Sequence, residues 1–517
     1  MTAPADCILR NGRVHTLASP APDGEPDAEA VAIRDGRIVR VADDYEIEFL
    51  EGVETETIDL GGRTLLPGFV DAHTHLEHSG QYLVHADLSA AESREAALEA
   101  LADRAADTEA GWVLGFGYDE SAWGESSYLR REELDSVSTD RPVAAIRVDM
   151  HTASLNGEAL ARTRESMADE HVRVEDGEPT GVVVEDAVGV VSEAYEPDVE
   201  GARELVRAAA DRAAALGITC VHDKVRGSHA PRVYRELALA GELPIRVRVD
   251  YWRHHLDAVE ELGLRTNAGG AFVRVGGIKT FTDGSFGGRT ARVRDPYADA
   301  PEGSDHPRGQ WVVEPDDYRA VVERADGAGL QVVSHAIGDE AIELALSAYE
   351  ATDDPAGSRH RIEHAELATD DQLERMAAAG VVASVQPNFH QWADDDGLYE
   401  RRLGPERTAR SNPIRRALDA GVPLAFGSDS MPMDPLLGVE HAVSAPHEAG
   451  RCTVGEALRA YTHGAAYAGF DEDRLGTVEV GKRADLVVLD ASPWAADSIA
   501  DVDVWMTLVD GRITHEG

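Results

Sequence analysis

Residues that could bind a metal ion follow apolar segments at four separated places in the sequence. His73 and His75 lie two positions apart in GFVDAHTHLE, and residues i and i+2 of a strand point to the same side. Such a pair often arises by chance. His335 in VVSHAIGD, His364 in RIEHAEL and Asp429 in LAFGSDS add three further candidates, each near the end of an apolar run. Imidazole and carboxylate groups together suit a borderline divalent metal such as Zn²⁺.

The lysine in VGGIKTFTDGSFGG is a further candidate. The chain contains three lysines, Lys224, Lys279 and Lys482, among its 49 basic residues. An arginine guanidinium stays protonated and is a poor nucleophile, whereas a buried lysine amine near positive charge can lose its proton. We therefore expect position 279 to need an amine, and Lys224→Arg and Lys482→Arg to change little. The alternative is that Lys279 survives by chance.

The segments between these residues predict a barrel. Strands are expected at about 65–73, 217–222, 244–252, 272–282, 331–336, 359–364, 381–387 and 422–428, and helical segments separate most of them. Alternating strands and helices predict a parallel sheet, and eight units predict a (β/α)8 barrel, an α/β fold. Active sites of such barrels lie at the carboxyl ends of the strands, where the five histidine and aspartate candidates fall. The alternative is five unrelated polar residues, each satisfied separately at a loop entry.

The two ends of the chain resemble each other. Asp35-Gly36 and Asp510-Gly511 each stand between alternating apolar and polar residues, which indicates β-hairpins. We expect residues 1–64 and 471–517 to form one β-sandwich domain, and residues 65–84 and 200–470 to form the barrel. Residues 85–199 contain further strand-like segments and are predicted to form an inserted subdomain.

Composition excludes several classes of partner. The net charge of −47 is spread along the chain and would repel nucleic acid and anionic membranes. Dispersed acidity with scarce lysine suggests a halophilic protein, in which concentrated salt screens self-repulsion. No apolar run is long enough to span a membrane, and no export signal is recognisable. Three cysteines far apart in sequence favour reduced thiols and a cytoplasmic location.

Six motifs together resemble the amidohydrolase superfamily: PGFVDAHTH, GGIKTFTDGSFGGRTA, VVSHAIGD, RIEHAEL, AFGSDSMPMDPL and GKRADLVVLD. The chain is most similar to the YtcJ-like branch, which includes N-substituted formamide deformylases. The resemblance implies a (β/α)8 barrel beside a β-sandwich and one or two divalent metals. Phe286 and Gly287 depart from the leucine and serine expected there, which leaves the substrate open.

The resemblance also implies a role for each candidate residue. His73 and His75 would bind one metal and His335 and His364 a second, with Lys279 bridging both after carboxylation. Asp429 would bind metal and act as general acid and base. His151, in the matched segment HTASLN, could reach the substrate. Arg289 in GGRTA could hold a substrate carboxylate with its guanidinium, although a plain salt bridge is the alternative.

The predicted function is hydrolysis of carbon–nitrogen bonds in a small-molecule amide, an N-acyl or N-formyl compound, by a metal-activated hydroxide. Two zinc ions per chain are expected, and a homodimer is left open. A mononuclear-metal deaminase of a nitrogenous ring is the alternative, since such a site needs no bridging lysine. A catalytically inactive scaffold of the same fold should have lost ligands, and all five histidine and aspartate candidates are present.

Overall fold

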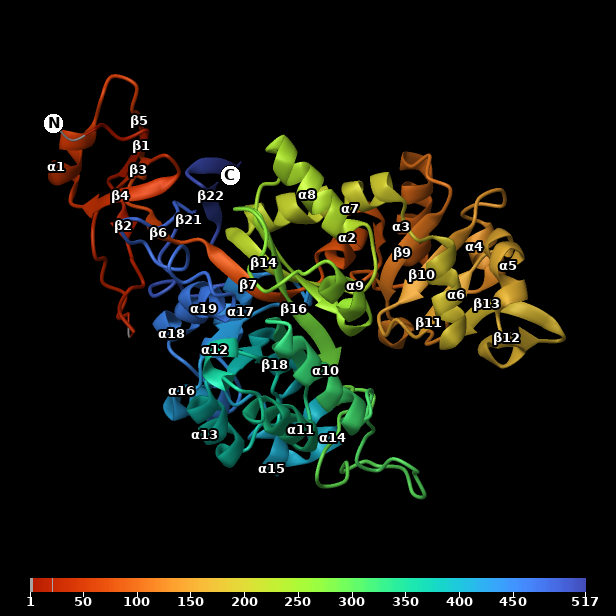
Figure 1. The fold of residues 1–517 in the computed structure, drawn as a ribbon. Coiled ribbons are helices and arrows are strands. Elements are labelled where there is room, and N and C mark those ends of the chain that lie inside the picture. The colour runs from red at the N-terminus through yellow and green to blue at the C-terminus, as the bar shows by residue number, and fades with distance from the viewer. Residues whose placement is uncertain (1–2, 21) are drawn as a thin grey trace. The chain divides into compact units, whose positions relative to one another are not determined.

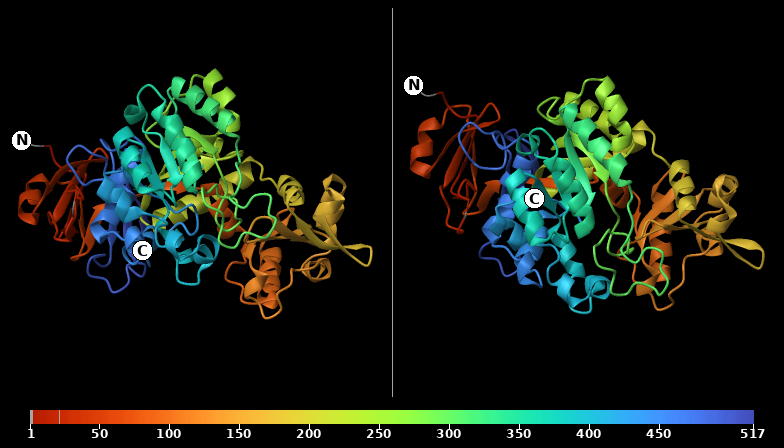
Figure 2. Two further views of the ribbon diagram at one scale, coloured as in Figure 1. Left: turned by 90° about the horizontal axis from the view of Figure 1, so that it is seen from below. Right: turned by 60° about the horizontal axis from the view of Figure 1, so that its bottom comes forward.

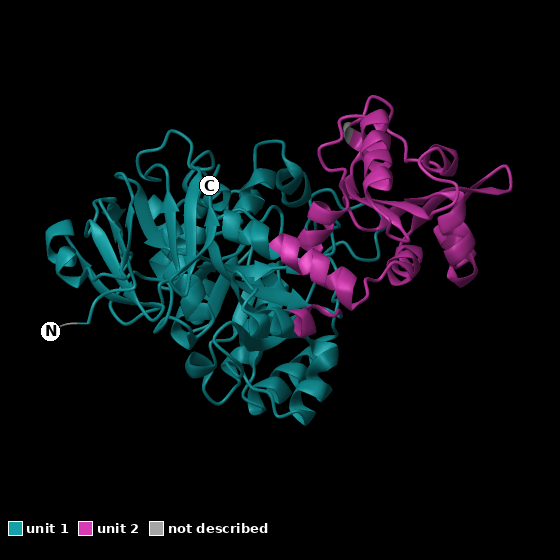
Figure 3. Cartoon of the chain, turned by 90° about the horizontal axis from the view of Figure 1, so that it is seen from above, with its two compact units in different colours: residues 1–76, 210–227, 234–517 teal, residues 77–209, 228–233 magenta. Residues whose placement is uncertain are grey.

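The computed structural model describes residues 3–20 and 22–517, which divide into two compact units (Figure 3). The first unit comprises residues 1–76, 210–227 and 234–517 and contains both the barrel and the sheets formed by the two ends of the chain. The second unit comprises residues 77–209 and 228–233. No helix among the described residues is long and apolar enough to cross a membrane.

The first unit is built around eight parallel strands in the order β7, β14, β15, β16, β17, β18, β19, β20. Their bounds are Phe69–Thr74, Ile218–Val225, Arg246–Trp252, Val273–Phe281, Gln331–Ala336, Arg361–His364, Val382–Val385 and Leu424–Phe426. Helices α10 (Pro315–Gly327), α11 (Asp339–Glu350) and α13 (Asp370–Ala379) pack on these strands (Figures 1 and 2). The predicted barrel of eight strands is therefore confirmed.

The seam between the first and last strands is closed by side-chain and loop contacts. The backbone N–H of Asp429 donates to the carbonyl of His73 at 2.7 Å. The buried Asp71 carboxylate accepts from the backbone N–H groups of His73 and Ser428, both at 3.0 Å, and from the Ser428 hydroxyl. Asp71 thus fixes the segment that presents Asp429 against the strand that presents His73.

The first predicted strand is in fact two strands. β6 (Thr64–Pro67) pairs with β21 (Leu486–Leu489) outside the barrel, and β7 begins at Phe69. Gly68 separates them, and a Cβ atom there would lie 2.2 Å from the Thr219 side chain. The backbone must therefore pass too close to β14 for any side chain at this position, and the chain changes sheets there.

Two sheets share one core, one formed by the N-terminal segment alone and the other by strands from both ends of the chain. One has the order β4 (Arg37–Ala42), β3 (Ala30–Arg34), β1 (Cys7–Arg10), β5 (Glu56–Asp59). The other has the order β2 (Arg13–Val14), β6, β21, β22 (Val504–Val509), β23 (Arg512–Glu516). Leu9 and Ile33 of the first sheet pack in one cluster with Leu486 and Met506 of the second.

Both Asp-Gly pairs form the predicted turns, with φ of 52° and 69° at Asp35 and Gly36 and of 55° and 73° at Asp510 and Gly511. The two turns abut, because a Cβ at Gly36 would lie 2.7 Å from the Asp510 carbonyl oxygen.

The second unit contains a six-stranded sheet in the order β12 (Val172–Glu175), β13 (Glu178–Val184), β11 (Thr152–Leu155), β10 (Val143–Arg147), β9 (Val113–Tyr118), β8 (Ala86–Asp87). Helices α5 (Gly157–Thr163) and α6 (Asp186–Ala194) contribute to one of its apolar clusters, and α3 (Arg94–Asp107) contributes to the other. The unit extends beyond the inserted subdomain predicted over residues 85–199.

Candidate metal centre

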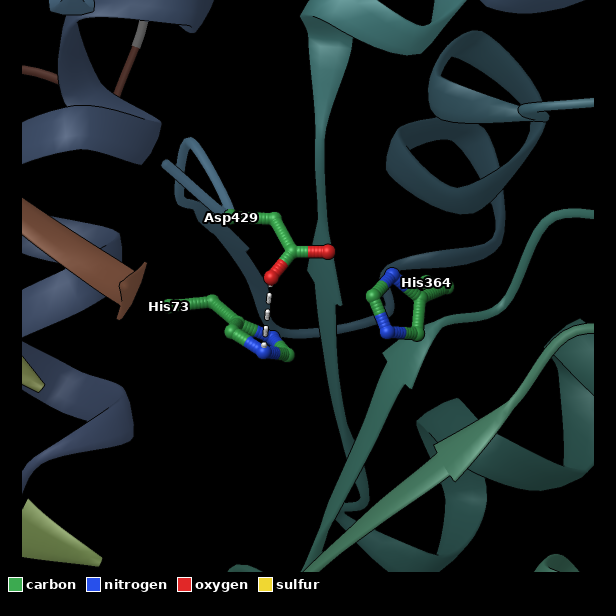
Figure 4. A group of neighbouring side chains, drawn as sticks. All are labelled: His73, His364 and Asp429. Atoms are coloured by element: carbon green, nitrogen blue, oxygen red, sulfur yellow. Dashed lines mark ion pairs between the residues drawn. The ribbon is translucent and has the colours of Figure 1, made fainter. Parts of the chain in front are cut away.

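The carboxyl ends of the barrel strands bring three of the predicted ligands together (Figure 4). His73 lies in β7, His364 ends β18, and Asp429 lies three residues beyond β20. Each offers a ligand atom, and these atoms all lie within 4.8 Å of one another. His75 follows β7, and its Nε2 atom is 3.2 Å from Asp429 Oδ1, while His73 Nε2 is 3.4 Å from the same oxygen.

These separations fit a bound metal ion. Two ligand atoms about 2.0–2.2 Å from a tetrahedral ion lie about 3.4 Å apart. Burial alone would raise the pKa of Asp429, but His73, His75 and His364 together lower it well below its usual range. Asp429 is therefore an anion surrounded by imidazoles, as a carboxylate ligand must be.

A buried carboxylate orients His73. Glu363 accepts from His73 Nδ1 at 2.5 Å, which leaves Nε2 directed at Asp429. The other Glu363 oxygen lies 2.9 Å from Arg361 Nε. Burial would raise the pKa of Glu363, but Arg361 and the buried lysines Lys224 and Lys279 lower it to about 2. A metal-binding histidine usually donates its second ring N–H to such a group, so Glu363 fits that role.

The other three histidines are held in the same way. In each of them, one ring nitrogen contacts a protein acceptor. His75 Nδ1 lies 3.2 Å from the Lys224 carbonyl, and His364 Nδ1 lies 2.7 Å from the Gln386 side-chain oxygen. His335 Nε2 lies 2.9 Å from the Gly284 carbonyl. The remaining nitrogens of His335 and His364 make no hydrogen bond to described residues. The two rings lie 4.5 Å apart between centroids. Their arrangement suits metal ligation.

His73, His335 and His364 are also neutral. Burial lowers the pKa of His364 to about 4 and holds the pKa values of His73 and His335 well below the ordinary value of 6.5. Nearby Lys279 contributes in the same direction for each of them. A neutral imidazole has a lone pair for a metal, and a protonated one does not.

Lys279 lies inside the barrel and not on its surface. Its side chain is buried on β16, and its amine makes no hydrogen bond or ion pair with the described residues. Its Nζ atom lies 4.8 Å from the centroid of the Phe281 ring. Burial lowers the pKa of Lys279 from 10.5 to about 8, although Glu363 opposes this effect. A buried amine without a partner is costly, so the position is chemically demanding.

We expected Lys224→Arg to change little, but the surroundings of Lys224 argue against this. Its ammonium group is fully buried and donates to Asp250 at 2.6 Å and to the Ala72 carbonyl at 3.0 Å. An arginine there would need space for a larger group in a closed interior. Lys482 is different, because it donates to Thr477 and pairs with Glu479 at 3.2 Å outside the barrel core.

Four residues without glycine's conformational freedom adopt left-handed backbone at this end of the barrel. They are His364 (φ 71°), Ala365 (φ 51°), Asp429 (φ 55°) and Ser430 (φ 61°). Such conformations cost energy and persist where the surrounding structure enforces them. Here each pair turns the chain at the end of β18 or just beyond β20, at a candidate ligand.

The two predicted substrate-binding residues already have protein partners. The Arg289 guanidinium donates to both oxygens of Asp299 at 3.0 and 2.8 Å, and Arg402 also pairs with Asp299. His151 lies in the second unit, where its exposed ring is 3.2 Å from Glu185. Their contact with a substrate stays a prediction.

Sequence reasoning missed Asp71, Glu363 and Gln386. For two of them, Asp71 and Glu363, the sequence contained a pattern that could have identified them. Asp71 precedes His73 by two positions and therefore shares its side of the strand, and Glu363 is an acidic residue within the buried run RIEH. Gln386 follows β19, at the same end of the barrel as the histidines, but a lone glutamine gives no pattern to recognise.

An eight-stranded barrel with imidazole and carboxylate groups at its carboxyl end defines a class of metal-dependent hydrolases. The model of the Amidohydrolase family matches residues 56–515, and the chain belongs to that family. Members of the superfamily generally bind divalent metal.

Known relatives cover the whole chain. It is 31% identical to a putative amidohydrolase, YtcJ, of Bacillus subtilis over 98% of this chain and 99% of that protein. It is 28% identical to an N-substituted formamide deformylase of Arthrobacter pascens over 100% of this chain and 99% of that protein. A crystal structure of an uncharacterized metal-dependent hydrolase from Pyrococcus furiosus matches with a TM-score of 0.80 and 31% identity, over 94% of this chain and 99% of that chain.

Proposed function

We propose that the protein cleaves carbon–nitrogen bonds other than peptide bonds in small-molecule N-acyl or N-formyl amides. The observation that carries this proposal is the ligand set, in which each of four histidines has one ring nitrogen held by a protein acceptor. The likeness to an N-substituted formamide deformylase supports the type of bond.

The donor set fits two divalent ions, and we propose zinc. His73 and His75 would hold one ion and His335 and His364 the other, with Asp429 as a further ligand. When bound, such ions polarise the substrate carbonyl and lower the pKa of water. The neutral, buried imidazoles and the ionised Asp429 match the protonation states that ligation needs.

Lys279 would supply the bridge. The lysine ammonium would first lose a proton, and the neutral amine would then add to carbon dioxide, forming a nitrogen–carbon bond and releasing a second proton. A cationic side chain would thus become an anionic carbamate with two oxygens. The lowered pKa of about 8 favours the neutral amine that this addition requires. The carbamate would replace the buried positive charge with a negative one, which bound divalent ions would compensate.

Asp429 would move the proton. Its ionised carboxylate can accept a proton from the attacking water and pass it to the nitrogen of the departing amine. This transfer matters because an amine is a poor leaving group as an anion. His73 and His75, both beside Asp429 Oδ1, fix the position of that carboxylate.

One observation favours a second candidate, a deaminase with one metal ion. The compact group of ligand atoms contains His73, His364 and Asp429 and does not include His335. A one-ion site would use that group and leave Lys279 unmodified. The number of bound ions separates the two candidates.

The test measures metal content and amide hydrolysis in Lys279 variants. Lys279→Arg should lose the paired ions and most activity, while Lys279→Glu, which supplies a shorter carboxylate, should recover part of the metal. Lys482→Arg is the matched control and should retain both ions and turnover. Two ions and normal turnover in Lys279→Arg would refute the bridge, and one tightly held ion in the active wild-type protein would favour the deaminase.

A further inference from the structure

A cavity of about 570 Å³ lies at the carboxyl ends of β14, β15 and β16. Arg226 directly follows β14, Trp252 ends β15, and Phe281 ends β16. Arg253 and His254, in the short helix η5 (Arg253–His255), complete the polar side of its lining. All of these residues belong to the first unit, and β16 also presents Lys279.

The cavity carries positive charge that no described residue neutralises. Arg226 and Arg253 form no ion pair within the described part of the chain, although the protein has a net charge of −47. Nearby Arg324, by contrast, pairs with both Asp257 and Glu260. Burial lowers the pKa of His254, and nearby His255, Arg226 and Arg253 act in the same direction, although a hydrogen bond to the Arg226 backbone opposes them.

Aromatic rings connect this cavity to the candidate metal centre. The Arg226 guanidinium lies 5.1 Å from the Trp252 ring centroid, and Trp252 lies 4.9 Å from Phe281. Phe281 in turn stacks on His335 at 4.9 Å and lies 4.8 Å from Lys279 Nζ. A single ring therefore contacts both the cavity lining and two candidate ligands. The Trp252 indole N–H is buried and has no acceptor among the described residues.

We propose that this cavity binds a carboxylate of the substrate, so that the enzyme prefers N-acyl or N-formyl compounds that carry a carboxylate close to an apolar group. The inference rests on the proposed hydrolase function and names its substrate class. A guanidinium group binds a carboxylate through two parallel hydrogen bonds, and Arg226 and Arg253 are the cations without an acidic partner here. Trp252 and Phe281 would contact the apolar part of the substrate.

The test compares substrates that differ only in the carboxylate. N-formyl and N-acetyl derivatives of phenylalanine would be assayed beside the same derivatives of 2-phenylethylamine. We expect kcat/KM to be about 10- to 100-fold higher for the acids, the range expected for hydrogen bonds to a charged group. Arg226→Gln and Arg253→Gln should each reduce this preference by lowering kcat/KM for the acids more than for the neutral amides. Arg319→Gln is the matched control, because Arg319 is an exposed arginine of the same unit, paired with Asp316.

Direct binding separates failure of this inference from failure of the proposed function. Calorimetry with phenylacetate and with 2-phenylethanol tests the cavity without any reaction. Binding of phenylacetate alone, lost in Arg226→Gln, would support the carboxylate site even if the wild-type protein hydrolysed none of the four amides, an outcome that would refute the hydrolase proposal. Equal kcat/KM for acids and neutral amides, or equal binding of both probes, would overturn the carboxylate site.

Discussion

Replacing Lys279 by methionine should stabilise the metal-free protein. Lys279 is buried, and its amine has no hydrogen-bond partner among the described residues. The pKa of Lys279 falls from 10.5 to about 8 because burial disfavours its charged form. At about 1.4 kcal/mol for each pH unit, this difference corresponds to about 3 kcal/mol of lost stability. Methionine fills a similar volume without a charge.

The pH dependence has a definite sign. Between pH 8 and 10.5 the unfolded chain binds more protons at this lysine than the folded chain, so stability rises with pH in that window. Below pH 8 the full cost applies, and above pH 10.5 it disappears. The gain from Lys279→Met should therefore be about 3 kcal/mol at pH 7 and less than half of that at pH 9.5.

Urea unfolding with a chelator present, at pH 7 and at pH 9.5, measures this difference. Lys482→Met is the control and should not stabilise the protein, because the Lys482 ammonium donates to Thr477 and pairs with Glu479. The reasoning is refuted if Lys279→Met unfolds at the same or a lower urea concentration than the wild type at pH 7. It is also refuted if the gain is the same at both pH values.

Three further changes should have measurable effects. Asp429→Asn should lower turnover by about 10²- to 10⁴-fold, the usual range for lost proton transfer, and near-normal turnover would assign that role to another residue. Glu363→Gln removes the carboxylate that orients His73, so metal affinity measured by chelator competition should fall by about 10- to 100-fold, and unchanged affinity would contradict the orienting role. Thermal melts from molar to millimolar salt should show falling stability, since the net charge of −47 becomes unscreened, and constant melting temperatures would argue against a halophilic protein.

The barrel was predictable because its strands are short apolar runs separated by helical segments with clear ends. Helix α13, for example, begins at a capping box formed by Thr369 and Gln372 and ends at Gly380 with φ of 66°. The Asp-Gly turns were predictable because aspartate and glycine favour the positive φ that such turns require. The division of the first strand at Gly68 was not, because it depends on a close approach to Thr219, 151 positions away by residue number.

The ligand candidates could be placed at strand ends from spacing alone, but their supporting residues could not. Glu363 and Gln386 act through hydrogen bonds to His73 and His364, and such pairs depend on the three-dimensional register of β7, β18 and β19. The burial of Lys224 was missed for a similar reason. Its salt bridge to Asp250 joins the neighbouring strands β14 and β15, and the register between these strands cannot be derived from the sequence.

The sheets shared by the two ends of the chain set an order for folding during synthesis. β6 leaves the ribosome long before β21, its partner, and Arg63 must wait for Asp490, 427 positions further along. The barrel strands all lie between these two points, so the barrel can form first. A chain interrupted after β20 would leave the apolar faces of β1, β3 and β6 without their cover, and quality-control proteases bind such exposed surfaces. Pairing of β6 with β21, which covers this core, therefore distinguishes a chain that includes β21 from one interrupted before it.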